Sequence, residues 1–232
     1  MEMPEWLESA APSQLGVFLG KQTSPRKSGL FIRHLCRCFP KVFHDPRNQT
    51  ALDSADRYEA GEVSEADFLA TLRPVEEIAA QSQAGLAEWT LNRTGDVDRH
   101  RRVGMAARIT REVATTGFYP DALMDLRRAV LEHGVGGGPR KNPIARAMRP
   151  LFLEHFGNPE QPVALDPSWL TDTALSLARH IYESRDFSVM PILADAMQDA
   201  GCDNDDILNH CREANGVHVR GCWVVDLVLG KC

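Results

Sequence analysis

The stretch "SPRKSGLFIRHLCRCFP", from Ser24 to Pro40, predicts an α-helix with both of its ends marked. Ser24 is a residue type that caps helix N-termini, and Pro25 follows at the first helical position, where a missing N–H breaks no hydrogen bond. Pro40 then breaks or kinks the helix. The residues at helical spacing, which give the helix one apolar face, are Leu30, Phe31, His34, Leu35 and Cys38.

The same combination of caps and helix breakers recurs along the chain. Asp45 and Pro46 predict a second capped helix that ends at Gly61, and residues 64–67 resemble a capping box ahead of a long helical stretch, interrupted at Pro74. Further helical segments follow, and few stretches alternate polar and apolar residues with period two. We therefore expect an all-α fold, an irregular multi-helix bundle or a helical stack.

The strongest break in composition is "GVGGGPRKNP", residues 134–143, whose glycines and prolines are incompatible with a helix interior. It predicts an N-terminal helical lobe over residues 1–134, a Gly/Pro-rich loop over 135–142 and a C-terminal helical lobe over 143–232, which carries a Cys/His corner. The segment "HVRGCWVVDLVLG" near the end leaves two alternatives open. Its valines suit a strand, while a glycine after a short apolar run suits a helix end.

Composition places the chain among ordinary folded proteins. It has 232 residues, of which 43% are hydrophobic and 25% charged, with a net charge of -6. An acidic balance argues against a dedicated nucleic-acid binder, because affinity for phosphates comes mainly from cations. The N-terminus lacks a secretory signal and no apolar run approaches the roughly 20 residues that cross a bilayer, so we expect a cytoplasmic protein without a membrane partner.

Residues 201–223, "GCDNDDILNHCREANGVHVRGCW", form the Cys/His corner, with three cysteines and two histidines. If Asp203 caps a helix over about residues 204–213, Cys211 faces inward on the apolar side of that helix. His210 then lies about 100° away around the helix axis and does not share a metal with Cys211.

A tetrahedral metal site at this corner would have to draw on four residues, which are Cys202, His210, His218 and Cys222. Zinc takes Cys and His ligands of this kind, but the tight C-x₂₋₄-C spacing of common zinc sites is absent. A packed helical corner with buried thiols is the ordinary alternative. We therefore expect no cofactor, although these donors would permit a zinc ion.

The stretch from Arg93 to Arg111 carries six arginines against two aspartates, a local charge of +4 (six minus two) in an otherwise acidic chain. A basic helix face of this kind suits nucleic acid or an acidic protein, although a solvated face is the ordinary explanation. The residues that we predict to bind such a partner are Arg99, Arg101, Arg102, Arg108 and Arg111.

Several stretches spread over nearly the whole chain resemble a family of uncharacterised bacterial proteins that occur as many paralogues. Among them are "EWLESAAPSQLGVFLGKQTSPRKSGLFIRHLCRCF", "LFLEHFGNPEQPV" and "HVRGCWVVDLVLG". The portion "ILADAMQDAGCDNDDILNHCR" is also similar, more weakly, to the helical repeat-companion module of bacterial repeat proteins. The resemblance implies one conserved unit with a variable Gly/Pro-rich insertion, and it carries no known activity.

Three hypotheses for function follow from these patterns. The leading one is a helical interaction module, or a subunit of a larger complex, that presents a surface to another protein. The second is a zinc- or thiol-dependent enzyme at the Cys/His corner, and the third is a nucleic-acid-associated subunit that uses the arginine-rich helix. Because no convergent catalytic set is evident in the sequence, we lean against an enzyme.

Overall fold

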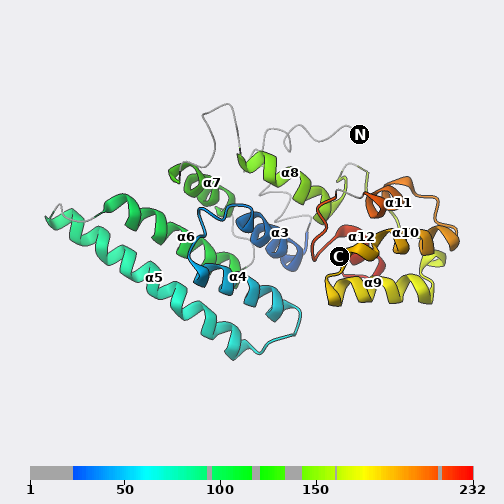
Figure 1. The fold of residues 1–232 in the computed structure, drawn as a ribbon, viewed down its shortest axis with the longest axis horizontal. Coiled ribbons are helices and arrows are strands. Elements are labelled where there is room, and N and C mark those ends of the chain that lie inside the picture. Colours follow the sequence, from blue (N-terminus) through cyan, green and yellow to red (C-terminus); the bar gives the residue numbers. More distant parts are fainter. Residues whose placement is uncertain are drawn as a thin grey trace. The chain divides into compact units, whose positions relative to one another are not determined.

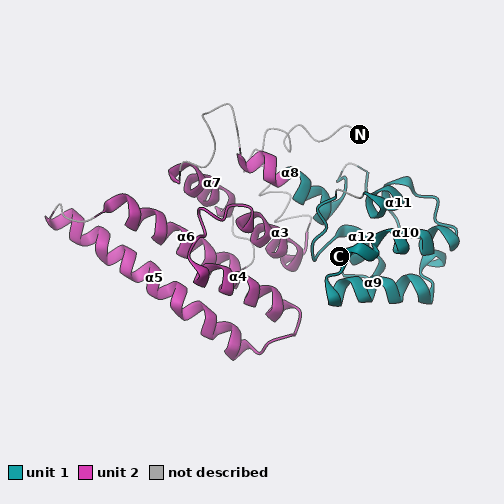
Figure 2. Ribbon diagram, viewed as in Figure 1, with its two compact units in different colours: residues 1–4, 149–232 teal, residues 5–148 magenta. Residues whose placement is uncertain are grey.

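The computed structural model describes residues 23–92, 96–116, 121–133, 143–159, 161–213 and 216–231. All regular structure in these residues is helical and none is a strand (Figure 1), which confirms the all-α prediction. None of the helices in these ranges is long and apolar enough to span a membrane. The chain divides into two compact units (Figure 2). Residues 5–148, keyed as unit 2 in the figure, are called the first unit, and the described residues from 149 onward, keyed as unit 1, are called the second unit. The predicted loop at 135–142 lies outside the described residues.

The first unit, residues 5–148, contains most of the long helices. They are α3 (Pro25–Arg37), α4 (Pro46–Glu59), α5 (Glu65–Asn92), α6 (Val97–Thr115) and α7 (Ala122–Glu132). Both predicted caps are present, since the Ser24 side chain accepts a hydrogen bond from the backbone N–H of Lys27, and Asp45 accepts one from that of Arg47. Gly61, after α4, adopts a φ of +73°, which favours glycine.

Helix α5 continues through Pro74, so the interruption predicted at that position is wrong. An internal proline removes one backbone hydrogen bond, and the packing of the helix compensates for it here, because Leu72, Val75 and Ile78 are all buried in the core of this unit. Helix α6 runs back alongside α5 (Figure 1). The two backbones approach closely at Gly104, where an added Cβ would lie only 2.8 Å from the Cβ of Ser82.

The side chain of Arg33 in this unit is fully enclosed. Its Nε lies 2.6 Å from Oδ1 of Asp56, its Nη2 lies 2.6 Å from Oε2 of Glu59, and its Nη1 donates to the carbonyl of Val113 at 3.3 Å. These contacts join α3, α4 and α6. A buried charge of this kind is tolerated because it is both paired and hydrogen-bonded.

The second unit contains the described residues from 149 onward. Its helices are the end of α8 (Pro143–Phe156), α9 (Asp172–Ser184), α10 (Met190–Asp199), α11 (Asp205–Arg212) and α12 (Trp223–Val228), with short 3₁₀ turns η1 (Pro167–Trp169) and η2 (Phe187–Val189). The C-terminal segment is therefore a helix. Asn204, and not Asp203, caps α11 by accepting the N–H of Ile207. The core between α9, α10, α11 and α12 includes Ile181, Leu193 and Cys211.

Candidate metal centre

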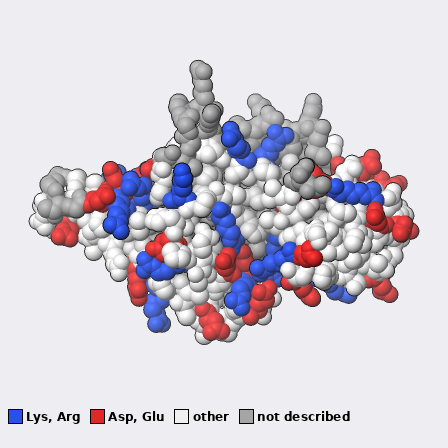
Figure 3. Space-filling model, viewed as in Figure 1, with Lys and Arg blue, Asp and Glu red and all other residues white. Residues whose placement is uncertain are grey.

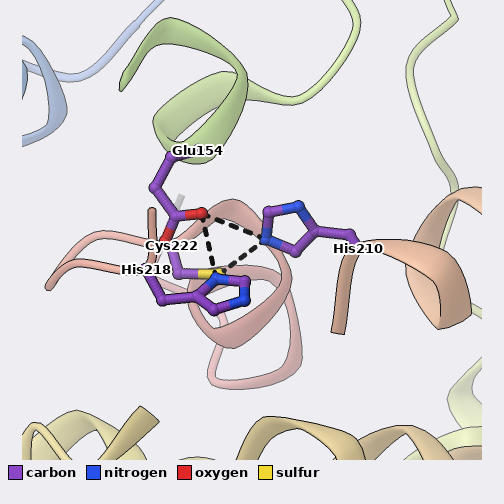
Figure 4. A group of neighbouring side chains, drawn as sticks. All are labelled: Glu154, His210, His218 and Cys222. Atoms are coloured by element: carbon purple, nitrogen blue, oxygen red, sulfur yellow. Dashed lines mark hydrogen bonds and ion pairs between the residues drawn. The ribbon is translucent and has the colours of Figure 1, made fainter. Parts of the chain in front are cut away.

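Four side chains of the second unit converge on one point, and they are Glu154, His210, His218 and Cys222 (Figure 4). One ligand atom from each lies within 4.8 Å of all the others. Glu154 and Cys222 are buried, and the two histidines are partly buried. The cluster thus offers one carboxylate, two imidazoles and one thiol within the reach of a single ion.

Each donor is positioned by a different piece of local structure. Glu154 lies in the last turn of α8, and its Oε1 accepts the backbone N–H of Val219 at 3.0 Å. His210 lies in the last turn of α11. His218 follows in the connection after α11, and Cys222 precedes the first residue of α12. Gly221, at a φ of +91°, makes the turn between them, a conformation that favours glycine.

Three of the six separations between donor atoms are close to those around a tetrahedral ion. Nε2 of His210 lies 3.1 Å from Sγ of Cys222 and 3.3 Å from Oε2 of Glu154, while Nδ1 of His218 lies 3.2 Å from that same oxygen. Bond lengths of about 2.0 Å to nitrogen and oxygen and 2.3 Å to sulfur give tetrahedral edges of about 3.3–3.5 Å. These three separations suit a zinc ion, and the other pairs of donor atoms lie within 4.8 Å.

The electrostatics of the cluster depend on the buried carboxylate. Burial raises the pKa of Glu154, but hydrogen bonds from His210 and His218 outweigh that effect and lower it overall. The hydrogen bond to Glu154 in turn raises the pKa of His218. Burial, together with the nearby charge of Glu154, raises the pKa of the Cys222 thiol. Without a metal the cluster therefore holds a neutral thiol, and a divalent cation would favour the thiolate.

The other described cysteines do not have the properties of nucleophiles. Burial raises the pKa of Cys36 and of Cys211 to about 12, and it also raises the pKa of Cys38 and of Cys202. A reactive thiol needs a lowered pKa. These values argue against a thiol-dependent enzyme at any of the described cysteines in the metal-free state.

Three of the four residues that the sequence suggested for this site, His210, His218 and Cys222, lie together in the structure. Cys202 does not join them: it is only 3% exposed and packs in the apolar core with Cys211. Glu154 occupies the fourth place, and it was not among the predicted ligands. A signal was present, because an acid within the apolar run "LFLEHF" needs a partner when that face is buried.

A pocket of about 520 Å³ lies beside the cluster. His210 belongs to both, and the ring of Trp223, whose centroid lies 5.4 Å from that of His210, forms part of the wall. Gly157 approaches the Trp223 ring so closely that an added Cβ would lie 3.2 Å from it. The remaining lining residues are Leu153, Asn158, Gln161, Val163, Asp206, Asn209, Arg212 and Glu213.

The predicted partner-binding arginines lie on α6, in the first unit. All except the partly buried Arg102 are exposed, and three of them face carboxylates. Arg101 lies 3.7 Å from Asp98, Arg108 lies 3.7 Å from Asp125, and Arg111 lies 3.2 Å from Glu76. The basic stretch is therefore partly neutralised by Asp125 and Glu76, which lie outside the residues that give the local charge of +4.

Comparison with known proteins found no matching family model, no matching curated protein and no matching solved structure. The resemblance to a paralogous bacterial family thus stays a prediction.

Proposed function

We propose that the second unit is a zinc-binding helical module, in which Zn²⁺ held by Glu154, His210, His218 and Cys222 ties α8 to α11 and α12. The observation that carries the proposal is the convergence of four donor atoms within 4.8 Å of one another. Imidazole, thiolate and carboxylate are the three protein ligands that zinc takes, and structural zinc sites are almost always four-coordinate.

The chemistry of the donors favours zinc over other common metal ions. Ca²⁺ and Mg²⁺ bind through oxygen, and this cluster offers a single carboxylate. A mixed set with one sulfur and two imidazole nitrogens suits a borderline-soft ion with tetrahedral geometry. The closest measured approaches, from 3.1 to 3.3 Å, are similar to tetrahedral edges around zinc.

A site with four protein donors is complete, which supports a structural role for the metal. The metal ion would hold the connection after α11 against the end of α8, and these two segments are far apart in the sequence. We propose that the protein acts by presenting the surface fixed in this way to another protein, as a module or subunit of a complex.

The test is the metal content of the full chain purified without added chelator. We expect one zinc per chain by elemental analysis, an intact native mass that includes one zinc, and a lower melting temperature after chelation, because metal binding contributes to folding free energy. Cys222→Ser should abolish the stoichiometric zinc. Cys202→Ser is the matched control, since that thiol is equally buried in the same unit and lies outside the cluster.

Two results would contradict the proposal. One is a chain that takes up no zinc when refolded with a slight excess of the ion. The other is equal loss of zinc in the Cys222→Ser and Cys202→Ser variants, because that would point to general damage to the fold and not to loss of a ligand.

A second candidate is a metal-dependent enzyme, and the observation that favours it is the pocket that shares His210 with the cluster. Catalytic zinc sites use three protein ligands and leave the fourth position to water or substrate. In this arrangement the histidines and Cys222 would hold the metal, and Glu154 would act as the general base, since its Oε2 lies 3.2–3.3 Å from the two histidine nitrogens. An exchangeable fourth ligand distinguishes this candidate from the structural site.

A further inference from the structure

A second pocket, of about 500 Å³, lies in the first unit and has a strongly basic lining. Four arginines and one histidine contribute to it, Arg101, Arg108, Arg111, Arg128 and His100, and its lining residues include no aspartate or glutamate. The other lining residues are Ala79, Ser82, Gln83, Leu86, Gly104 and Met105. Figure 3 shows basic side chains gathered over α6 and α7, the helices that supply these arginines.

The pocket arises from the spacing of residues on α6 and from the small residues beneath them. Positions 101, 104, 105, 108 and 111 are three or four residues apart and share one face of α6. Arg128 adds a fourth guanidinium from α7. Beneath these residues α5 and α6 approach closely. An added Cβ at Gly85 would overlap the ring of His100, and one at Gly104 would lie 2.8 Å from Ser82.

The arginines of this pocket are already paired, but only weakly. Arg101 and Arg108 each lie 3.7 Å from a carboxylate, Arg111 lies 3.2 Å from Glu76 and 3.0 Å from Glu112, and Arg128 lies 3.1 Å from Glu132. These arginine side chains are between 49% and 65% exposed, and ion pairs at such positions contribute little to stability. Each guanidinium has five N–H donors, so it can keep its carboxylate and bind a second acceptor.

We propose that this pocket binds a compact organic polyphosphate, and that its four arginines donate hydrogen bonds to the phosphoryl groups. Arginine pairs with phosphate through two parallel hydrogen bonds, a geometry that gives both affinity and specificity. The volume falls within the range of small-molecule sites, and the side chains of Leu86 and Met105 offer apolar surface to the organic part of the ligand.

A long nucleic acid fits the arrangement less well. The basic groups line a concavity of limited size, and one of the four arginines comes from α7 and not from α6. Arg99 and Arg102, which the sequence grouped with the other arginines of α6, are absent from the pocket lining, while Arg128 of α7 is present. A polyphosphate small enough to contact α6 and α7 together is therefore the ligand that matches the observed positions.

The experiment is calorimetric titration of the full chain with ATP and with inorganic pyrophosphate, both without divalent metal, at about 0.1 M salt, where long-range charge effects are largely screened. We expect saturable binding with one site per chain, tighter for ATP than for pyrophosphate. Arg128→Gln and Arg108→Gln should each weaken ATP binding about tenfold or more, because each removes charged hydrogen bonds to phosphate. Zinc content should stay unchanged in both, since the metal cluster lies in the other unit.

The matched control is Arg127→Gln, which changes the same charge at the neighbouring exposed position of α7, outside the pocket lining. Its affinity for ATP should stay within about twofold of the wild type, because Arg127 does not line the pocket and interactions between exposed charges are weakened by salt. Equal weakening by Arg127→Gln and Arg128→Gln would overturn the proposal, because it would indicate a general charge effect. So would the absence of saturable binding, or preferential binding of an oligonucleotide that depends on Arg99 and Arg102.

Discussion

Glu154 and His218 are 64 residues apart in the chain, yet Oε2 of the first lies 3.2 Å from Nδ1 of the second. The N–H of Val219 binds the other carboxylate oxygen at 3.0 Å. The Glu154 side chain is only 3% exposed, and these hydrogen bonds stabilise its charge only when the chain has folded around it. Metal binding at this point would therefore be coupled to the folding of the second unit, because the unfolded chain does not hold these donors together.

Replacing Glu154 with glutamine tests whether its carboxylate is a ligand. Gln keeps the shape of the side chain and an oxygen that can accept the N–H of Val219, but it removes the negative charge. We expect zinc affinity, measured by competition with a chromophoric chelator, to fall by roughly 100-fold or more, since loss of mere supporting groups already costs 10–100-fold.

The control for this change is Glu213→Gln, at an exposed position that lines the neighbouring pocket. It removes one negative charge near the site and should leave zinc affinity nearly unchanged. If the two variants bind zinc equally well, the carboxylate of Glu154 is not a ligand.

A different prediction concerns the buried ion pair in the first unit. Replacing Arg33 with methionine removes the cation that Asp56 and Glu59 share, and breaking a buried pair from one side destabilises by about 3–5 kcal/mol. Asp56 keeps its contact with Arg37 at 2.7 Å, so we expect the low end of that range. Hydrogen exchange of the α3 and α4 amides reports this loss within the affected unit. Arg57→Met, at an arginine that is 53% exposed and pairs with Glu62 at 3.7 Å, should cost no more than about 1 kcal/mol. Similar effects of the two substitutions would contradict the assigned role of Arg33.

Local signals in the sequence located most helices but only part of the metal site. Helix caps such as Ser24 act over three or four residues, so they can be read without knowledge of the fold. His210, His218 and Cys222 could be grouped because they lie within one short stretch. Glu154 could not, since only the packing of α8 against the C-terminal segment brings it near. Cys202 was grouped by proximity in sequence, but the end of α10 directs it into the core.

The acid sensitivity of the first unit should depend on Asp56. Burial raises the pKa of this carboxyl, but the charges of Arg33 and Arg37 outweigh that effect and lower it overall. Because the folded pKa lies below the unfolded value of about 3.9, ionised Asp56 stabilises the fold above that pH, and the contribution is lost as the pH falls through the folded pKa. Burial raises the pKa of Glu59, so the ionised form of Glu59 destabilises the fold, opposite to the effect of ionised Asp56.

We therefore expect the protection of the α3 and α4 amides to fall as the pH is lowered below about 4, and to fall less steeply in Asp56→Asn. At neutral pH, Asp56→Asn should be less stable than the wild type, because Arg33 loses one of its two carboxylate partners. Asp53→Asn, at a side chain that is 65% exposed, controls for the loss of one carboxylate from the same helix. An Asp56→Asn variant that matches the wild type at both pH values would contradict this assignment.

Substitution of zinc by Co²⁺ separates the structural site from the catalytic alternative. If Glu154, His210, His218 and Cys222 fill the coordination sphere, the cobalt protein should show the intense visible absorption of a four-coordinate ion and a thiolate-to-cobalt charge-transfer band. The band should be absent in Cys222→Ser and present in Cys202→Ser. Azide or a small hydroxamate should leave the spectrum unchanged, because no position is open to them. A saturable shift on adding either anion would instead show an exchangeable ligand position, and it would favour the enzyme, with its substrate in the pocket that His210 shares.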